Sequence, residues 1–300
     1  MFCIREERRD ELTKKFEAIF AGLFEHPLTA RKERGFVHRH SKRFDDLTLS
    51  YIDEGSGEVL VLLHGFCGSP AYWEKIIPAL SEGYRVIAPA LRGHGKSSAV
   101  CDSYTIEDMS SDVKRLLEEL QIDKVIMFGH SLGGYVTLSF AEQYPEHLSG
   151  FSLVHSTAHA DSDEAKNGRT KTIELIGQNG IEPLIKNLVP KLFAPKNLQS
   201  MTDEVELVSE IGLNTSVSGA KGALWAMRER LDRHAVLSQS KVPILLIAGE
   251  FDQIIPKEKV FSVESSMIKQ IVLEDAGHMG MVEKPKELAT IMQDFIKNLQ

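Results

Sequence analysis

The sequence has few cysteines and no long apolar run. Its 300 residues include three cysteines, Cys3, Cys67 and Cys101, which are widely spaced and form no C-x-x-C pair. A disulfide framework or a zinc ribbon therefore has no support, and a reducing cytoplasm fits best. No stretch approaches the roughly 18 apolar residues of a membrane span. The charged residues 5–10 are not followed by the apolar run of a secretion signal, so we expect a soluble, cytoplasmic protein.

Positive charge is also in short supply. The chain has 35 lysines and arginines against 43 aspartates and glutamates, a formal net charge of −8, and no dense basic run. Nucleic-acid surfaces need an excess of positive charge, so this balance argues against a nucleic-acid partner. The length is sufficient for a full core and suits one large α/β domain with an insertion, or two smaller domains.

The first 44 residues differ in pattern from the rest. Apolar side chains within residues 8–24 recur at spacings of three, four and seven, which predicts an amphipathic helix. We expect a helical extension over residues 1–44 that packs on the domain or between subunits. Binding to a membrane surface or to a partner groove is the alternative.

Strand-like and helix-like segments alternate from residue 45 onward. The apolar, β-rich runs are 47–53, 59–64, 84–89, 124–129, 150–155, 243–249 and 270–274. The helix-like segments are 71–81, 106–120, 132–143, 257–266 and 285–299. Strands that are apolar almost throughout predict an α/β fold with a mainly parallel central sheet flanked by helices. This core comprises residues 45–155 and 237–300.

The alternation stops between residues 156 and 236. This block has helical periods at 165–178, 181–188, 203–211 and 218–230, separated by glycine, proline and asparagine, and no strand. We interpret it as a helical cap inserted between two strands. Ligands of open α/β sheets bind beyond the carboxyl ends of the strands, so the cap should cover the site. Trp225 and Met227 are candidates to line it, although aromatic residues on helices more often belong to a core.

The most informative motif is VIMFGHSLGG at residues 125–134. Ser131 lies between two glycines, directly after a strand-like run and directly before a helix-like one. A strand that turns at once into a helix holds its apex residue in a strained backbone conformation, and only small residues fit at 129 and 133. The motif therefore predicts a nucleophile elbow, with the N-H groups of the new helix beside it.

Two further candidate residues follow later strands. Asp252 lies in the loop after strand 243–249, and His278 lies in the loop after strand 270–274. Nucleophile, acid and base thus occur in an order used by serine hydrolases, and all three can meet at one rim of a sheet. Glu250 and Asp275 are the nearest rival acids.

These motifs together resemble the α/β-hydrolase fold superfamily, in its capped, carboxylesterase-like branch. The resemblance covers residues 47–299 and rests on HGFCG at 64–68, RGHGKS at 92–97, GHSLGG at 129–134, GEFD at 249–252 and GH at 277–278. It implies a Ser131–His278–Asp252 triad, with the backbone N-H groups of Phe66 and Leu132 as the oxyanion hole. Family members often carry Asp where this chain has Ala90, a position that is not catalytic.

The predicted function is hydrolysis of a carboxylic ester of a small molecule through an acyl-enzyme, with a lactone or thioester as variants. A serine at the elbow argues against dehalogenase or epoxide-hydrolase chemistry, which uses a carboxylate there. Three alternatives share the fold: carbon–carbon bond hydrolysis or a lyase step, peracid formation, and ligand binding without catalysis. We assign Trp225 to substrate binding and expect no cofactor and no metal. The substrate and the oligomeric state stay open.

Several other residues are interpreted as structural. His64 and His94 read as loop residues that bond to the backbone, and Cys67 reads as a packing residue because no charge near it in sequence would activate a thiol. His155 and His159 have a spacing that a metal pair could use, but no third ligand accompanies them. The glycines at 129–134 match neither of the common phosphate-binding loop patterns.

Overall fold

The computed structural model describes residues 39–45, 47–99, 101 and 103–299. Eight strands form one sheet in the order β1-β2-β4-β3-β5-β6-β7-β8. The strands are β1 (Arg39–Phe44), β2 (Leu47–Gly55), β3 (Val59–Leu63), β4 (Arg85–Pro89), β5 (Val125–His130), β6 (Leu148–Val154), β7 (Ile244–Gly249) and β8 (Ile268–Leu273). Pairing is antiparallel from β1 to β2 and from β2 to β4, and parallel from β4 to β8. The predicted α/β class with a mainly parallel sheet is confirmed.

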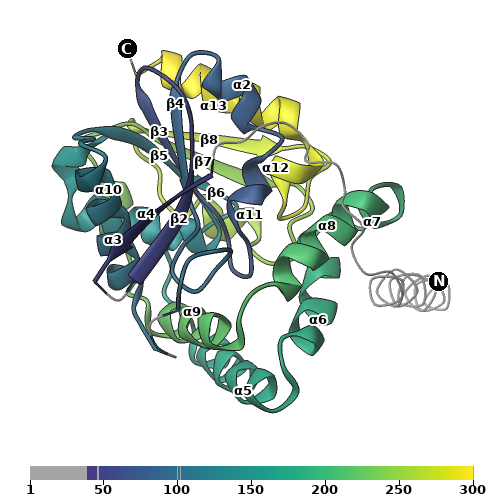
Figure 1. Ribbon diagram of the computed structural model, residues 1–300. Coiled ribbons are helices and arrows are strands. Elements are labelled where there is room, and N and C mark those ends of the chain that lie inside the picture. Colours follow the sequence, from purple (N-terminus) through teal and green to yellow (C-terminus); the bar gives the residue numbers. More distant parts are fainter. Residues whose placement is uncertain (1–38, 46, 100, 102, 300) are drawn as a thin grey trace.

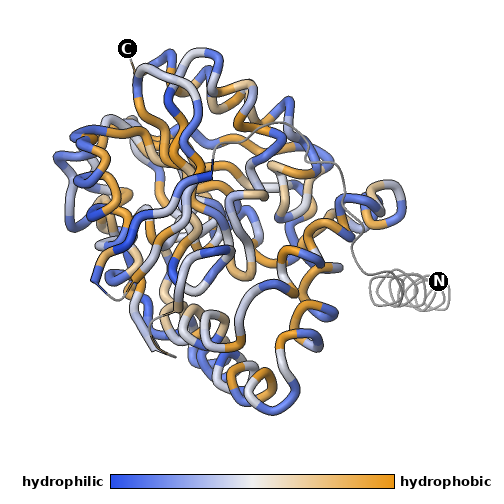
Figure 2. Tube along the Cα trace, viewed as in Figure 1, coloured by the Kyte–Doolittle hydropathy of each residue, from blue (hydrophilic) through white to orange (hydrophobic). Residues whose placement is uncertain are grey.

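Helices cover both faces of this sheet (Figure 1). One face packs against α3 (Ile106–Glu119), α4 (Leu132–Gln143) and α10 (His234–Ser238), and the other against α2 (Ile77–Ser81), α12 (Gly280–Glu283) and α13 (Pro285–Lys297). Alternate side chains of β3 illustrate the division, since Val61 and Leu63 enter the first cluster and Leu60 and Leu62 the second. Both faces are buried, which explains why the strands read as apolar throughout (Figure 2).

A block of helices lies between β6 and β7. It contains α5 (Asp163–Asn179), α6 (Glu182–Leu192), α7 (Asn197–Ser200), α8 (Thr202–Leu213) and α9 (Val217–Glu229). The four helical periods that the sequence shows in this region correspond to α5, α6, α8 and α9. These helices gather at one end of the molecule, below and beside the sheet in Figure 1.

Three segments differ from expectation. Residues 39–44, assigned to the helical extension over 1–44, form edge strand β1, whose mostly exposed, charged sequence lacks the apolar alternation of a strand. The segment 71–81 is divided into a 3-10 turn, η1 (Pro70–Trp73), and α2, because Pro78 has no N-H to donate within a continuous helix and fits only in a first turn. The helix expected over 257–266 is only α11 (Lys257–Val260), since serines and a β-branched residue follow it. The predicted amphipathic helix at 8–24 lies outside the described residues.

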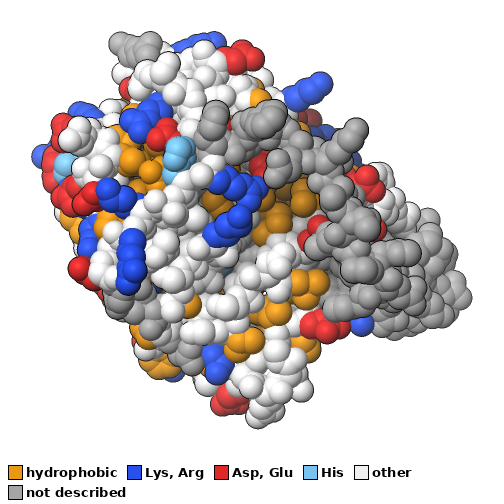
Figure 3. Space-filling view, in the orientation of Figure 1, with side chains coloured by type: hydrophobic (Ala, Val, Ile, Leu, Met, Phe, Trp, Pro, Cys, Tyr) orange, Lys and Arg blue, Asp and Glu red, His pale blue; other side chains and the backbone are white. Residues whose placement is uncertain are grey.

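Acidic and basic side chains both occur on the face shown in Figure 3, in line with the mixed charge of the sequence. Among the described residues, no helix combines the length and the apolar character that crossing a membrane requires.

Candidate active site

Ser131 occupies the turn between β5 and α4. Its backbone has φ 49° and ψ −113°, a conformation that a non-glycine residue seldom adopts. A Cβ atom on Gly129 would lie 2.3 Å from the carbonyl oxygen of Gly133, so glycine is required beside the turn. Ser131 is the residue before the first turn of α4, and its side chain makes no capping hydrogen bond. The local sterics are those that the motif predicts.

Asp252 and His278 form a buried hydrogen-bonded pair. Nδ1 of His278 lies 2.7 Å from Oδ2 of Asp252, and the two side chains are 2% and 0% exposed. The other carboxylate oxygen accepts the N-H groups of Ile254 and Ile255 at 2.8 and 3.0 Å. Burial raises the pKa of Asp252, but His278, His155 and these backbone donors outweigh it, so the pKa lies below its ordinary value. Asp252 is therefore ionised at neutral pH, and Nδ1 of His278 must carry the proton between them.

The loop that carries His278 also reaches the elbow. Nε2 of His130, the residue before Ser131, lies 2.9 Å from the carbonyl oxygen of His278, and the two imidazole rings are 5.0 Å apart. No hydrogen bond joins the Ser131 hydroxyl to His278 within the part of the chain that the structure describes. The structure thus places the three candidates at one edge of the sheet, with Asp252 and His278 in direct contact and the His278 loop bonded to the residue before Ser131.

The two rival acids have other partners. Glu250 accepts the backbone N-H of Asp275 at 2.9 Å. The Asp275 carboxylate forms ion pairs with Lys196 and Lys284 at the surface. Their geometry leaves Asp252 as the acid in contact with His278.

The loop 64–68 packs against the turn that carries Ser131. A Cβ atom on Gly65 would be 2.7 Å from Nδ1 of His130 and 3.3 Å from Cβ of Ser131, so the loop can approach this closely only with glycine there. The backbone N-H groups of Phe66 and Leu132 donate to no protein acceptor among the residues described. Two free donors on either side of Ser131 are the arrangement that an oxyanion hole needs.

His64 and His94 hold this loop through the backbone. Nδ1 of His64 lies 2.8 Å from the carbonyl oxygen of Gly65, and its Nε2 accepts the N-H of Leu91 at 3.0 Å. Nδ1 of His94 lies 3.0 Å from the carbonyl oxygen of Arg92. Burial lowers the pKa of His64 to about 3 and that of His94 to about 4. Both rings are neutral structural groups, as the sequence suggests.

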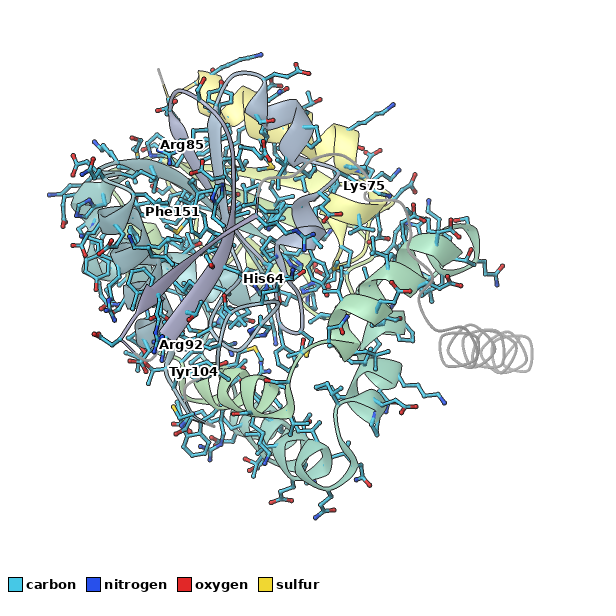
Figure 4. The ribbon with its side chains drawn as sticks, viewed as in Figure 1. His64, Lys75, Arg85, Arg92, Tyr104 and Phe151 are labelled. Carbon is cyan, nitrogen blue, oxygen red and sulfur yellow. The ribbon has the colours of Figure 1, made fainter. Side chains whose placement is uncertain are left out.

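Arg92 and Tyr104 connect the RGHG turn to the cap. The guanidinium of Arg92 donates two hydrogen bonds of 2.6 Å to Asp112 and lies 5.4 Å from the centre of the Tyr104 ring. The Tyr104 hydroxyl donates to the carbonyl oxygen of Gly219, in α9, at 2.8 Å. Figure 4 shows Arg92 and Tyr104 next to each other beside this helix.

Glu283 is a site residue that the sequence reasoning missed. Its buried carboxylate accepts the N-H of Ala194 at 2.9 Å, the side-chain amide of Asn197 at 2.7 Å and the N-H of Gly277 at 2.8 Å. One side chain thereby joins the cap segment between α6 and α7 to the loop that carries His278. The only sequence signal is an acidic residue in the otherwise apolar stretch after His278.

Two other predicted residues lie as follows. Trp225 is 41% exposed on α9, and its ring is 5.0 Å from Cζ of Arg228. Its assignment to substrate binding remains a prediction that this exposure does not support. Cys67 is buried, and burial raises the pKa of its thiol, so it stays protonated and packs in the core.

A cavity of about 510 Å³ lies at the opposite ends of the strands. Its lining includes Leu148 and Phe151, at the start of β6, together with Val236 and Val242. The chemistry-bearing residues follow the carboxyl ends of β5, β7 and β8, where ligands of parallel sheets bind. We therefore place the candidate site at Ser131 and not in this cavity.

One group of side chains could hold a metal ion. His159, Asp232 and His234 each offer a ligand atom, and these atoms lie within 4.8 Å of one another. The pair suggested by sequence spacing does not form, because His155 is buried beside Asp252, with its Nδ1 3.8 Å from Oδ2 of that residue.

Several known proteins are similar to this chain in sequence. The chain is 32% identical over 247 residues to the dihydrolipoyllysine-residue acetyltransferase component of the acetoin cleaving system of Pseudomonas putida; the match covers 80% of this chain and 64% of that protein, less than two thirds of it. It is 25% identical over 255 residues to 3-oxoadipate enol-lactonase 2 of Acinetobacter baylyi, covering 84% and 94% of the two chains.

Among solved structures, the fold is similar to that of a thermophilic esterase from Thermogutta terrifontis, determined with malate bound. The TM-score is 0.84 at 28% identity, and the match covers 87% of this chain and 99% of that one. A family model described as the alpha/beta hydrolase fold matches residues 58–285. With the turn at Ser131, the sheet order and the bonded pair of Asp252 and His278, this match shows that the chain belongs to the α/β hydrolase fold family.

Proposed function

We propose that this hydrolase is a serine carboxylesterase that cleaves an ester of a small molecule. The observation that carries the proposal is the buried hydrogen bond between His278 and Asp252, formed beside a serine in a strained turn. Because Nδ1 of His278 donates to an ionised carboxylate, its Nε2 is free to accept a proton. A histidine in this tautomer is the base that a serine hydroxyl needs at neutral pH.

Each step of the proposed reaction has a residue assigned to it. His278 takes the Ser131 proton as the hydroxyl attacks the carbonyl carbon, and Asp252 stabilises the resulting imidazolium. The N-H groups of Phe66 and Leu132 bind the oxyanion. Collapse of the tetrahedral intermediate breaks the bond to the alcohol, which leaves with the proton from His278. Water, deprotonated by the same histidine, then attacks the acyl carbon; the bond to the Ser131 oxygen breaks, that oxygen takes the proton back from His278, and the acid is released.

The decisive experiment is the pair Ser131→Ala and Ser152→Ala, assayed with a short-chain p-nitrophenyl ester. Ser152 is a matched control because its buried hydroxyl, in β6, has no hydrogen-bond partner. We expect Ser131→Ala to abolish hydrolysis and Ser152→Ala to retain it, with both variants folded. Activity retained by Ser131→Ala, or a fluorophosphonate label found on any other residue, would overturn the mechanism.

A lactone is the second candidate substrate, favoured by the similarity to an enol-lactonase. A lactone is an internal ester, so the same three residues would open its ring without any change of mechanism. Comparing kcat/KM for lactones and for open-chain esters of increasing acyl length distinguishes the two. Acylation in a single turnover without release would instead indicate a ligand-binding protein on this fold.

The cytoplasmic location expected from the cysteine content belongs to this proposal as well. Its support is that Cys67 and Cys101 are both free thiols. Fractionation of the producing cell, followed by detection of the chain with an antibody, tests it, and recovery outside the cytoplasm would contradict it.

A further inference from the structure

Three potential metal ligands meet where the cap joins the core. His159 lies in the segment that enters the cap after β6, and Asp232 and His234 lie in the segment that leaves it, at the start of α10. One ligand atom of each residue is within 4.8 Å of the other two. None of the three takes part in the proposed hydrolysis.

The side chains are spaced and exposed as a metal site requires. Nδ1 of His234 lies 2.8 and 2.9 Å from the two carboxylate oxygens of Asp232, and the imidazole rings of His159 and His234 are 4.3 Å apart. Zinc binds imidazole nitrogen and carboxylate oxygen at about 2.0 to 2.2 Å, so two ligands of one ion lie up to about 4 Å apart. The Asp232 and His234 side chains are 54% and 27% exposed, which allows the small rotation needed and gives ions access.

The backbone on both sides of the cluster is held in place. The N-H of Arg233 donates to the carbonyl oxygen of Ala158 at 2.9 Å, and Nε of Arg230 donates to that of His159 at 3.0 Å. The guanidinium of Arg233 is itself buried and forms an ion pair with Glu142. These bonds connect the entering and leaving segments, so the ligands start from nearly the geometry in which an ion would hold them.

The local charges favour a transition metal over calcium or magnesium. Two cations lie near His159, since Nε of Arg230 donates to its carbonyl oxygen and Lys259 acts on its ring electrostatically. Two nearby cations disfavour an ion held by charge alone, whereas imidazole nitrogens suit zinc-class ions.

We propose that His159, Asp232 and His234 bind a divalent transition-metal ion of the zinc class, and that this ion joins the two segments through which the cap is attached. The site departs from the expectation of no metal that the sequence alone suggested. Water would complete the coordination. The expected consequence is a cap whose attachment is strengthened by the ion.

The test uses the full-length chain without an affinity tag, titrated with Co²⁺ followed by its visible absorption and with Zn²⁺ by calorimetry. We expect one ion per chain, and at least about tenfold weaker binding in His159→Ala and in His234→Ala. His147→Ala is the matched control, because His147 lies 3.4 Å from Glu146 and 3.6 Å from Asp123 but forms no candidate metal cluster within the described part of the chain. Absence of binding, or equal affinity in all four proteins, would overturn the site.

The effect on the cap has its own measurement. Saturating Zn²⁺ should raise the melting temperature of the unmodified chain and of His147→Ala, because an ion that binds only the folded state stabilises it. The same addition should leave His159→Ala and His234→Ala unchanged. Binding without any rise in the unmodified chain would contradict the role in cap attachment.

His155, directly after β6, is a buried histidine to which the proposed reaction gives no role. Its Nε2 accepts the N-H of Gly280 at 3.2 Å, which places the ring proton on Nδ1. Nδ1 has no hydrogen-bond partner and faces Oδ2 of Asp252 at 3.8 Å, with both side chains 0% exposed. We infer that His155 is a positioning residue whose Nδ1 proton holds the Asp252 carboxylate in line with His278. This inference rests on the proposed function.

Two amide substitutions separate this role from packing. The amide of Asn at 155 can reach the place of Nδ1, and Asn tolerates the positive φ of 49° found there. The longer Gln reaches the place of Nε2 and loses the donor to Asp252. We expect His155→Gln to lower kcat about tenfold at unchanged KM, and His155→Asn to restore most of it. Equal loss in both variants, or no loss in either, would overturn the role, while Ser131→Ala tests the proposed function separately.

Discussion

Helices α4 and α5 show how differently the core and the cap are built. In α4, nine of twelve residues are buried between the sheet and neighbouring helices. In α5, Ile176 alone among seventeen residues is buried. A closely packed, buried side chain is held in one position, because its neighbours would have to move if it adopted another. A mostly exposed helix lacks that constraint. The core therefore holds the reacting groups in place, and the cap has room to vary.

The two regions meet at a small number of polar contacts. Glu283 joins the segment after α6 to the His278 loop, and the Tyr104 hydroxyl joins the RGHG turn to α9. The Glu283 carboxylate accepts four backbone or amide donors, and leaving any of these groups unpaired in the interior is costly. The effects of substitutions should accordingly be largest in the core, smaller at the junction and smallest in the cap.

The largest effect is expected in the core, at Asp252. Asp252→Asn keeps the size of the side chain but can hold His278 in the wrong tautomer, so we expect kcat to fall by about 10⁴-fold. The measurement is the hydrolysis rate of the p-nitrophenyl ester, with Glu250→Gln as the control acid on the same loop. A smaller loss than that of the control would contradict the assignment.

At the junction, Glu283→Gln should lower the free energy of unfolding by about 3 kcal/mol, because the amide turns a donor toward backbone N-H groups. Urea unfolding followed by circular dichroism measures this. We expect activity to fall with stability, since the His278 loop loses an anchor. An unchanged unfolding midpoint would show that cap and core do not depend on this contact.

Acid should destabilise the core through its buried histidines. The pKa values of His64, His94 and His155 lie at about 3, 4 and 4, below that of a free imidazole, and α5 to α9 contain no histidine. These histidines therefore bind protons in the unfolded chain at a pH at which they stay neutral in the folded one. The stability that is present above about pH 6.5 is lost as the pH falls. Each of the three histidines should lower the free energy of unfolding by about 2 kcal/mol by about pH 4.5. Urea unfolding at about pH 7 and at about pH 4.5 measures the loss, and equal midpoints at these two pH values would refute the prediction.

The smallest effect is expected on the outer side of the cap. Trp225 is 41% exposed, so Trp225→Ala should change the free energy of unfolding by less than about 0.5 kcal/mol. We also expect the preference for acyl chain length to stay the same, because the ring contacts Arg228 at the surface. A shifted preference for acyl chain length would instead support the assignment of Trp225 to substrate binding.

Elements with strong local patterns could be predicted, and those shaped by their neighbours could not. The buried strands and the cap helices α5, α6, α8 and α9 match the sequence pattern closely, since apolar periodicity reports burial directly. Strand β1 could not be recognised, because an exposed edge strand of charged residues is specified by its pairing with β2. The prediction of a helix over 257–266 was wrong, because a periodic pattern does not reveal at which residue a helix ends.

The sequence by itself determined the elbow at Ser131, because the glycines around it act through backbone sterics over a few residues. Only the tertiary structure decided that Asp252, and neither Glu250 nor Asp275, contacts His278. It also paired His159 with His234 and placed His155 beside Asp252. Such contacts join residues far apart in the chain, and the packing of the sheet and its loops selects them.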